Sequence, residues 1–163
     1  PTRGLMGYTS RFLTLTKGTG VINRIFHGYG KFEGEMDGRK NGALISMATG
    51  KAVAFAIFNL QARGEMFVTH NDPVYEGMIV GLAPKPGDMI INVMKGKQLT
   101  NMRTQGTDEN VVLTPVRQMS IAEQLSMLNT DEALEITPKS LRLRKAILNP
   151  NDRKKNEKSG TPL

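Results

Sequence analysis

A polar stretch in the second half of this sequence carries residue types that bind phosphate groups. It covers residues 95–106, holds three cations with several amides and hydroxyls, and contains no acid. Its candidate contacts are Lys95, Lys97, Gln98, Asn101 and Arg103. Lys and Arg neutralise phosphates, and side-chain amides add hydrogen bonds to them. The stretch therefore favours RNA binding, with an ordinary solvated loop as the alternative.

A second basic stretch covers residues 139–158, with eight cations and two acids. Thr137 followed by Pro138 has the form of a helix N-cap with proline at the first helical position, which predicts a helix ending at Asn149-Pro150. The apolar residues of that helix would pack against the rest of the domain, and its cations would point away from the domain. The candidate RNA contacts here are Lys139, Arg142 and Lys145. A solvated charged face is the alternative.

Other residues whose types could bind phosphate, bind metal or take part in catalysis fit structural roles better. The glycines of residues 17–20 follow a predicted helix and precede a strand, whereas a phosphate-binding turn runs from strand to helix, so a helix C-cap is the better interpretation. The sequence contains no G-x-x-x-x-G-K-[ST] motif and no Cys. His27 and His70 have no second ligand at metal spacing, and Asp131-Glu132 suits a solvated turn. We therefore predict no catalytic residues, no metal and no nucleotide cofactor for this sequence.

The elements that must position the basic residues follow from periodicity and turn signals. Helices are expected at 7–17, at 52–63 and from Ser120, where Glu123 completes a capping box. Strands are expected at 21–26, 43–47, 65–69, 75–82, 89–94 and 111–113. The chain is thus predicted to be α+β: a partial α/β sandwich, then a domain with a small, mostly antiparallel sheet or barrel and several helices.

The sequence begins within a helix–turn–strand unit, which suggests that partner elements precede it. Leu13, Ile22 and Phe26 are therefore expected to be partly exposed. The positive charge lies at the two ends, with +4 in residues 1–40 and +6 in residues 139–158, and the −3 of residues 41–138 brings the net charge to +7. Such a distribution favours polyanionic partners. Few aromatic residues and no long apolar run argue against a membrane, so a cytoplasmic location is expected.

Several segments together resemble the BipA/TypA family of translational GTPases, which is related to elongation factor G. They are residues 1–5 (PTRGL), 17–20 (KGTG), 41–46 (NGALIS), 58–65 (FNLQARGE), 74–81 (VYEGMIVG), 95–103 (KGKQLTNMR), 113–115 (LTP) and 137–145 (TPKSLRLRK). By this resemblance, residues 1–34 are the second half of a ferredoxin-like domain. Residues 35–163 are the family's C-terminal ribosome- and tRNA-binding domain.

The resemblance also implies a function. The family binds the ribosome, its C-terminal domain engages rRNA and the acceptor end of the A-site tRNA, and it is implicated in large-subunit assembly and stress adaptation. GTP and Mg²⁺ would be bound by an upstream domain, another partner of this region. The alternative is a stand-alone RNA-binding assembly factor without GTPase activity. A small enzyme is disfavoured because the sequence shows no convergent nucleophile, base or metal set.

Overall fold

The structure is a computed structural model that describes residues 2–32, 34, 39–96 and 112–159. Its helical elements are η1 (Thr2–Leu5), α1 (Tyr8–Leu15), α2 (Ala54–Gln61), α3 (Ile121–Ser126) and α4 (Pro150–Ser159). Its strands are β1 (Ala43–Ser46), β2 (Gly50–Lys51), β3 (Glu65–Met66), β4 (Pro73–Val74), β5 (Ile79–Leu82), β6 (Met89–Ile91), β7 (Glu132–Ile136) and β8 (Leu141–Lys145). The predicted α+β class is confirmed.

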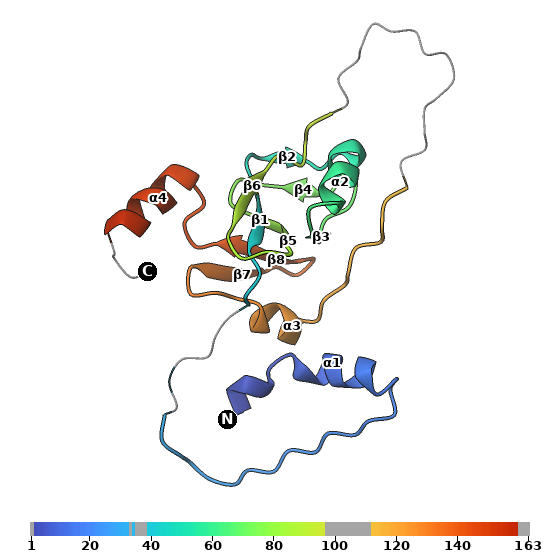
Figure 1. Ribbon diagram of the computed structural model, residues 1–163, viewed down its shortest axis with the longest axis vertical. Coiled ribbons are helices and arrows are strands. Elements are labelled where there is room, and N and C mark those ends of the chain that lie inside the picture. The colour runs from blue at the N-terminus through green and yellow to red at the C-terminus, as the bar shows by residue number, and fades with distance from the viewer. Residues whose placement is uncertain (1, 33, 35–38, 97–111, 160–163) are drawn as a thin grey trace, which may run out of the picture.

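A four-stranded sheet in the order β3-β5-β1-β6 forms the centre of the molecule (Figure 1). Strand β5 pairs antiparallel with both β1 and β3, whereas β1 and β6 run parallel. Two further sheets of two strands each, β2-β4 and β7-β8, flank it. The sheet is therefore mostly antiparallel, as expected, and the strands of the described residues do not close into a barrel.

Strand β1 is buried on both faces because successive side chains point to opposite sides of a strand. Leu44 belongs to a core cluster with Ile57 of α2 and Val80 of β5. On the other face, Ile45 packs in a second cluster that includes Leu143 of β8. The central strand thus joins a helix on one side to the β7–β8 hairpin on the other.

The hairpin of β7 and β8 replaces the helix expected from Thr137-Pro138. Its register runs from Glu132 opposite Lys145 to Ile136 opposite Leu141, and residues 137–140 form the turn. Thr137 does accept a hydrogen bond from the backbone N–H of Ser140 at 3.0 Å, as an N-cap would, but the chain then reverses. The helix prediction was wrong because the period-two alternation in residues 141–145 matches a strand.

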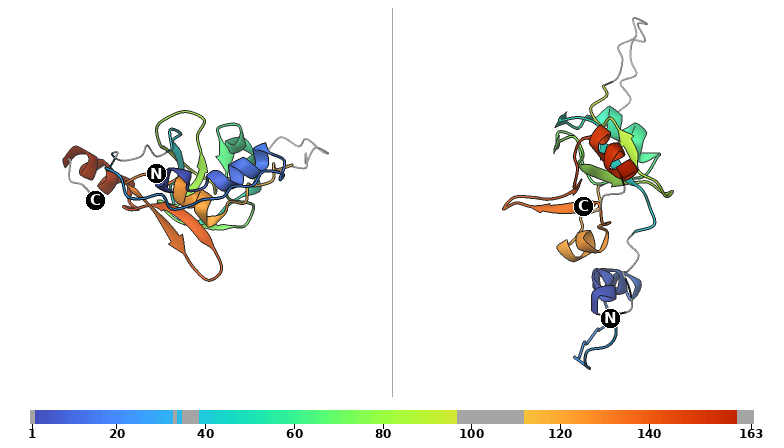
Figure 2. Two further views of the ribbon diagram at one scale, coloured as in Figure 1. Left: turned by 90° about the horizontal axis from the view of Figure 1, so that it is seen from below. Right: turned by 90° about the vertical axis from the view of Figure 1, so that its left-hand side faces the viewer.

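The N-terminal segment packs loosely against the rest. Helix α1 contains no buried residue, and it lies beside α3 (Figures 1 and 2). Leu13 is 41% exposed and Phe26 is 73% exposed, while Ile22 is half-buried. The expected exposure is therefore confirmed. The strand expected at 21–26 is absent from the described chain, where it has no neighbouring strand to pair with.

Among the remaining described elements, β2, β4 and α4 were not expected, and α4 begins at the Asn149-Pro150 pair, where a helix was predicted to end. The helix C-cap proposed for residues 17–20 is confirmed, since Gly18 has φ 80° and its N–H donates to the carbonyl of Leu13 at 2.7 Å. The capping box of Ser120 and Glu123 is also present. Residues 112–113 do not form the expected strand, and residue 111 lies outside the described part. None of the described helices has the length and apolar character needed to cross a bilayer.

Candidate nucleic-acid interface

The polar stretch 95–106 is only partly described. Lys95 is exposed and follows the segment that leaves β6. The other four candidates, Lys97, Gln98, Asn101 and Arg103, lie outside the described residues. Their binding of RNA phosphates stays a prediction.

Helix α2 anchors the chain on both sides of this stretch. At the start of the helix, the N–H of Val53 donates to the carbonyl of Val93 at 2.9 Å. At its end, the Gln61 amide donates to the carbonyl of Thr114 at 2.9 Å and accepts from the Thr114 N–H at 3.2 Å. The Gln61 side chain thus pairs with the backbone as a neighbouring strand would. One helix is therefore hydrogen-bonded to the chain both before the basic stretch, at Val93, and after it, at Thr114.

The hairpin places its three candidates in three different environments. Lys139 is exposed in the turn and makes no ion pair with any described residue. Arg142 lies partly exposed on β8, 3.2 Å from a carboxylate oxygen of Glu135. Lys145 is buried at the far end of β8. Of the three, Lys139 alone is both exposed and without a carboxylate partner in the described structure.

Lys145 is the buried centre of an ionic network. Its ammonium lies 2.5 Å from Asp88, 2.6 Å from Asp131 and 2.9 Å from Glu132. Arg39, the first residue of the described range 39–96, donates two hydrogen bonds to Glu132 and one to the carbonyl of Met127. The network therefore joins the hairpin, the end of α3 and the turn before β6.

Burial and pairing act in opposite directions on the charges of this network. Burial alone would lower the pKa of Lys145, but its hydrogen bonds to Asp131, Asp88 and Glu132 leave that pKa raised. Likewise, burial would raise the pKa of Asp88, but the hydrogen bonds from Lys145 and from the N–H of Ala43 leave it lowered. All of these shifts favour the ionised pair.

The expectation that Lys145 faces away from the domain is wrong. Its side chain is 2% exposed and surrounded by carboxylates, so it is not accessible to an RNA phosphate. The expectation of a solvated Asp131-Glu132 turn also fails in part: the Glu132 side chain is 0% exposed, while that of Asp131 is 47% exposed. Sequence spacing could not reveal either fact, because the partners are distant in the chain.

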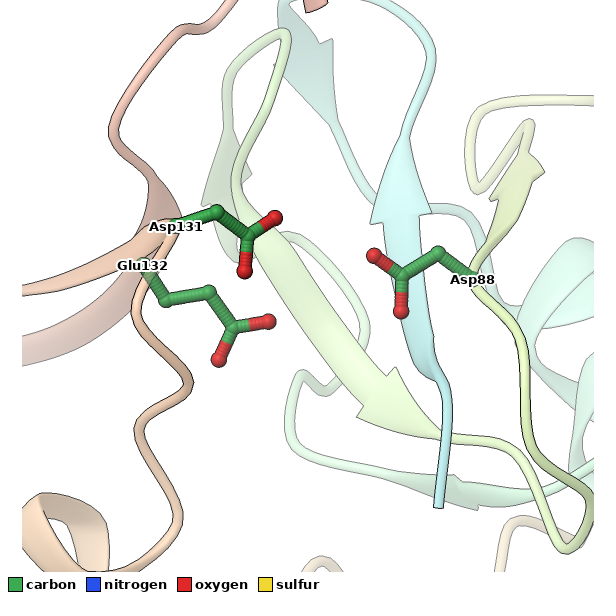
Figure 3. A group of neighbouring side chains, drawn as sticks. All are labelled: Asp88, Asp131 and Glu132. Carbon is green, nitrogen blue, oxygen red and sulfur yellow. The ribbon is translucent and has the colours of Figure 1, made fainter. Parts of the chain in front are cut away.

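The same three carboxylates have the spacing of metal ligands. Their oxygens lie within 4.8 Å of one another, and Figure 3 shows Asp131 and Glu132 of the hairpin facing Asp88 across a short gap. The Lys145 ammonium contacts all three of them. A protein cation therefore already fills the position that a metal ion would take.

A groove of 760 Å³ lies between the hairpin turn and the segment that leads into α3. We call it the hairpin groove. It is lined by Phe67, Val68, Met78, Ile79, residues 116–119, Ile121, Gln124 and residues 136–143. Among these described residues, three are basic and none is acidic: Arg117, Lys139 and Arg142. The groove thus joins two predicted RNA contacts to one further cation.

Three residues at these sites carry no functional signal in the sequence: Arg117, Gln124 and Gln61. Arg117 lies 3.2 Å from the capping residue Glu123, and its side chain is 45% exposed. The sequence does not predict a binding role for Arg117, because it is a single cation before a capping box and nothing in the sequence places it beside residues 136–143. Gln61 was noticed only as part of a matching segment, and its contact with Thr114 spans 53 positions.

Comparison with known proteins identifies the family. A family model described as the TypA/BipA C-terminal domain matches residues 41–150. The chain is 48% identical over 162 residues to "Large ribosomal subunit assembly factor BipA" of Buchnera aphidicola, covering 99% of this chain and 27% of that protein. It is 47% identical over 156 residues to the protein of that name in Salmonella typhimurium, covering 95% and 26%. The Haemophilus influenzae protein is 43% identical over 162 residues, covering 99% and 26%.

The chain thus spans about a quarter of the length of these curated relatives. The matched region 41–150 contains the central sheet, the hairpin and Lys145 with its three carboxylate partners, whereas Arg39 precedes it. By this match, which covers more than half of the sequence, the chain belongs to the TypA/BipA C-terminal domain family.

Proposed function

We propose that this chain is the ribosome-binding region of a large ribosomal subunit assembly factor of the BipA type. The observation that carries the proposal is the similarity along 99% of the chain to a protein of that name. The basic residues supply the physical means, because Lys and Arg bind RNA phosphates and release counterions from them. On this proposal the chain acts in the cytoplasm, where ribosomes assemble.

The RNA contacts that we propose form two groups. Lys95, Lys97, Gln98, Asn101 and Arg103 form the first. Lys139 and Arg142 of the hairpin form the second, and buried Lys145 is left out. By family resemblance, we propose that these residues engage rRNA and the acceptor end of the A-site tRNA. A role in stress adaptation would follow from the effect on ribosome assembly.

Sedimentation of the chain with large ribosomal subunits tests this proposal. Replacing Lys95, Lys97 and Arg103 together with Ala should weaken binding. It should also reduce the slope of log affinity against log salt by up to about 2.7. This value takes the slope of about 0.9 per phosphate contact that holds for duplex DNA and applies it to three lost contacts. The control with equal charge loss replaces Lys17, Lys51 and Lys85, which are exposed and lie outside the basic stretch. Unchanged affinity and salt slope in the first variant would exclude these contacts.

We further propose that GTP hydrolysis is not performed by these residues. The sequence lacks the glycine-rich turn that cradles nucleotide phosphates before a helix. Isothermal titration of the chain with Mg²⁺-GTP or Mg²⁺-ATP should therefore give no specific heat of binding. A micromolar dissociation constant would contradict this part of the proposal.

A further inference from the structure

We propose that the hairpin groove binds one unstacked nucleotide of a single-stranded RNA, with a phosphate at Lys139 and the base beside Gln124. This inference rests on the proposed RNA-binding function and names the ligand of one site within it. Three properties of the groove carry the argument: an unsatisfied amide, apolar walls and unbalanced positive charge.

Gln124 supplies the hydrogen-bonding group. It is 8% exposed and lines the groove, and its Oε1 has no hydrogen-bond partner in the described structure. A buried acceptor without a partner costs stability, so a native structure that keeps one needs a reason. Its Nε2 donates to the carbonyl of Met119 at 3.5 Å, which is long for such a bond. This weak restraint leaves the amide free to turn its acceptor toward a ligand.

The walls of the groove suit the flat face of a base. Phe67, Met119, Ile121 and Leu141 supply apolar surface on several sides. The volume of 760 Å³ falls within the range of pockets that hold small organic groups. Single-stranded RNA is recognised in this way, by stacking a splayed-out base on apolar or guanidinium surfaces and hydrogen bonding its edge.

The charge of the groove suits a phosphate. Arg117 and Arg142 each keep one carboxylate partner, Glu123 and Glu135 respectively, at 3.2 Å. Lys139 has no such partner among the described residues, so it is the cation that gains most from an anion. The two guanidinium groups retain further donors and planar faces for the ribose, the phosphate or the base.

A nucleotide combines these three features in one unit: an anion, a flat apolar surface and N–H donors. An acidic peptide would need several residues to supply the same set. The bases with an exocyclic amino group, such as adenine and cytosine, present the donor that Gln124 Oε1 lacks. Uracil presents two carbonyl acceptors beside its single N–H and should bind less well.

NMR titration of the chain with tetranucleotides tests the proposal. The probes are the RNA tetramers of adenosine and of uridine and an abasic ribose-phosphate tetramer. The adenosine tetramer should shift the backbone signals of residues 116–124 and 136–143 and bind about 10-fold more tightly than the uridine tetramer. The N3–H of uracil is flanked by two carbonyl oxygens that repel the buried acceptor of Gln124, whereas the amino group of adenine pairs with it without that repulsion. The abasic tetramer should bind more weakly than either.

Two variants separate binding from structure. Gln124→Met removes the acceptor at similar size, so it should abolish the preference for adenosine while leaving the urea midpoint equal or higher. Gln124→Glu places a negative charge in the groove and should weaken all RNA tetramers. Lys139→Ala should reduce the salt slope by about 0.7, the loss of one single-strand phosphate contact. The matched control Lys51→Ala changes an exposed lysine outside the groove and should have no such effect.

The outcomes distinguish this inference from the proposed function. Equal affinity for the adenosine and abasic tetramers would overturn the base site but leave RNA binding intact. An unchanged adenosine preference in Gln124→Met would overturn the role of Gln124. Tighter binding of an oligoglutamate peptide to the same residues would assign the groove to a protein partner. Failure to bind both RNA and large ribosomal subunits would overturn the proposed function as well.

Discussion

Lys145 and Lys139 lie on the same hairpin, yet the structure gives them different roles. Lys139 is exposed in the turn, whereas Lys145 is 2% exposed and contacts three carboxylates. A buried charge is stable only when it is paired and hydrogen-bonded. At the scale of residues, position therefore decides whether a lysine stays accessible to solvent or is buried among carboxylates of the fold.

Replacing Lys145 with Met should lower the free energy of unfolding by about 3–5 kcal/mol. Removal of the ammonium leaves the buried carboxylate of Glu132 with Arg39 and the N–H of Asn129 as its partners, and it takes the cation away from Asp88 and Asp131. Urea denaturation measures the change. The control Lys139→Ala should stay within about 0.5 kcal/mol of the original chain. Equal midpoints for the two variants would show that the network does not stabilise the hairpin.

Ionisation of Tyr75 is expected to lower the free energy of unfolding at alkaline pH. Burial, followed by the hydrogen bond to Glu135 and the charge of that carboxylate, raises the pKa of Tyr75 from 10.0 to about 12. The neutral phenol thus stabilises the fold fully below pH 10, and this contribution is lost between pH 10 and 12. Lys145, whose pKa is also raised, adds to the loss above its unfolded value of 10.5.

We therefore expect Tyr75→Phe to reduce the fall in unfolding free energy between pH 10 and 12. Urea titrations at several pH values measure this slope. The control is Tyr29→Phe, which changes a tyrosine that is 99% exposed and whose ring contacts Phe26. A Tyr75→Phe chain with the original alkaline slope would contradict the assignment.

At the scale of elements, one sequence signature gave two different structures. Thr137-Pro138 and Asn149-Pro150 both place a capping residue before proline. Only the second begins a helix, α4, where Asn149 accepts from the N–H of Asn151 at 2.8 Å. The first becomes a hairpin turn because Leu143 of β8 is buried against the central sheet. Packing of an alternating strand overrides a local cap.

Close approach of two backbone segments makes Gly42 essential to the central sheet. A Cβ added at Gly42 would lie 1.8 Å from the carbonyl oxygen of Gly87. Gly42→Ala should therefore separate the starts of β1 and β6 and lower the unfolding free energy by about 1–3 kcal/mol or more. In the control Gly30→Ala, the new methyl group meets no atom within 4 Å. Chemical denaturation of the two variants checks the prediction, and equal losses would refute it.

At the scale of the whole molecule, the two predicted units are unequally packed. The core clusters draw their buried residues from positions 43–143, while helix α1 buries none. Gly7 provides one close contact across to α3, where an added Cβ would lie 2.6 Å from the Ser126 hydroxyl. The boundary between residues 1–34 and 35–163 stays a prediction.

Truncation tests this boundary. Residues 35–163 should unfold cooperatively with nearly the urea midpoint of the full chain, because residues 1–34 contribute little buried surface. Residues 42–163 serve as the comparison, since they also lose Arg39. That second chain should be less stable by about 1–3 kcal/mol, the cost of leaving part of a buried carboxylate unsatisfied. Loss of cooperative folding in residues 35–163 would move the boundary.

The sequence alone determined the features that depend on neighbouring residues. Helix α2, the capping box of α3, the Gly18 helix end and the apolar strand β1 all follow from short-range pattern, because capping and periodicity act within a few residues. The family resemblance was also readable, from short segments spread along the chain. Tertiary structure alone decided the burial of Lys145, the pair of hydrogen bonds between the Gln61 amide and the backbone of Thr114, and the hairpin groove. Each of these joins residues distant in sequence, and the energy that fixes them comes from desolvation and packing between elements.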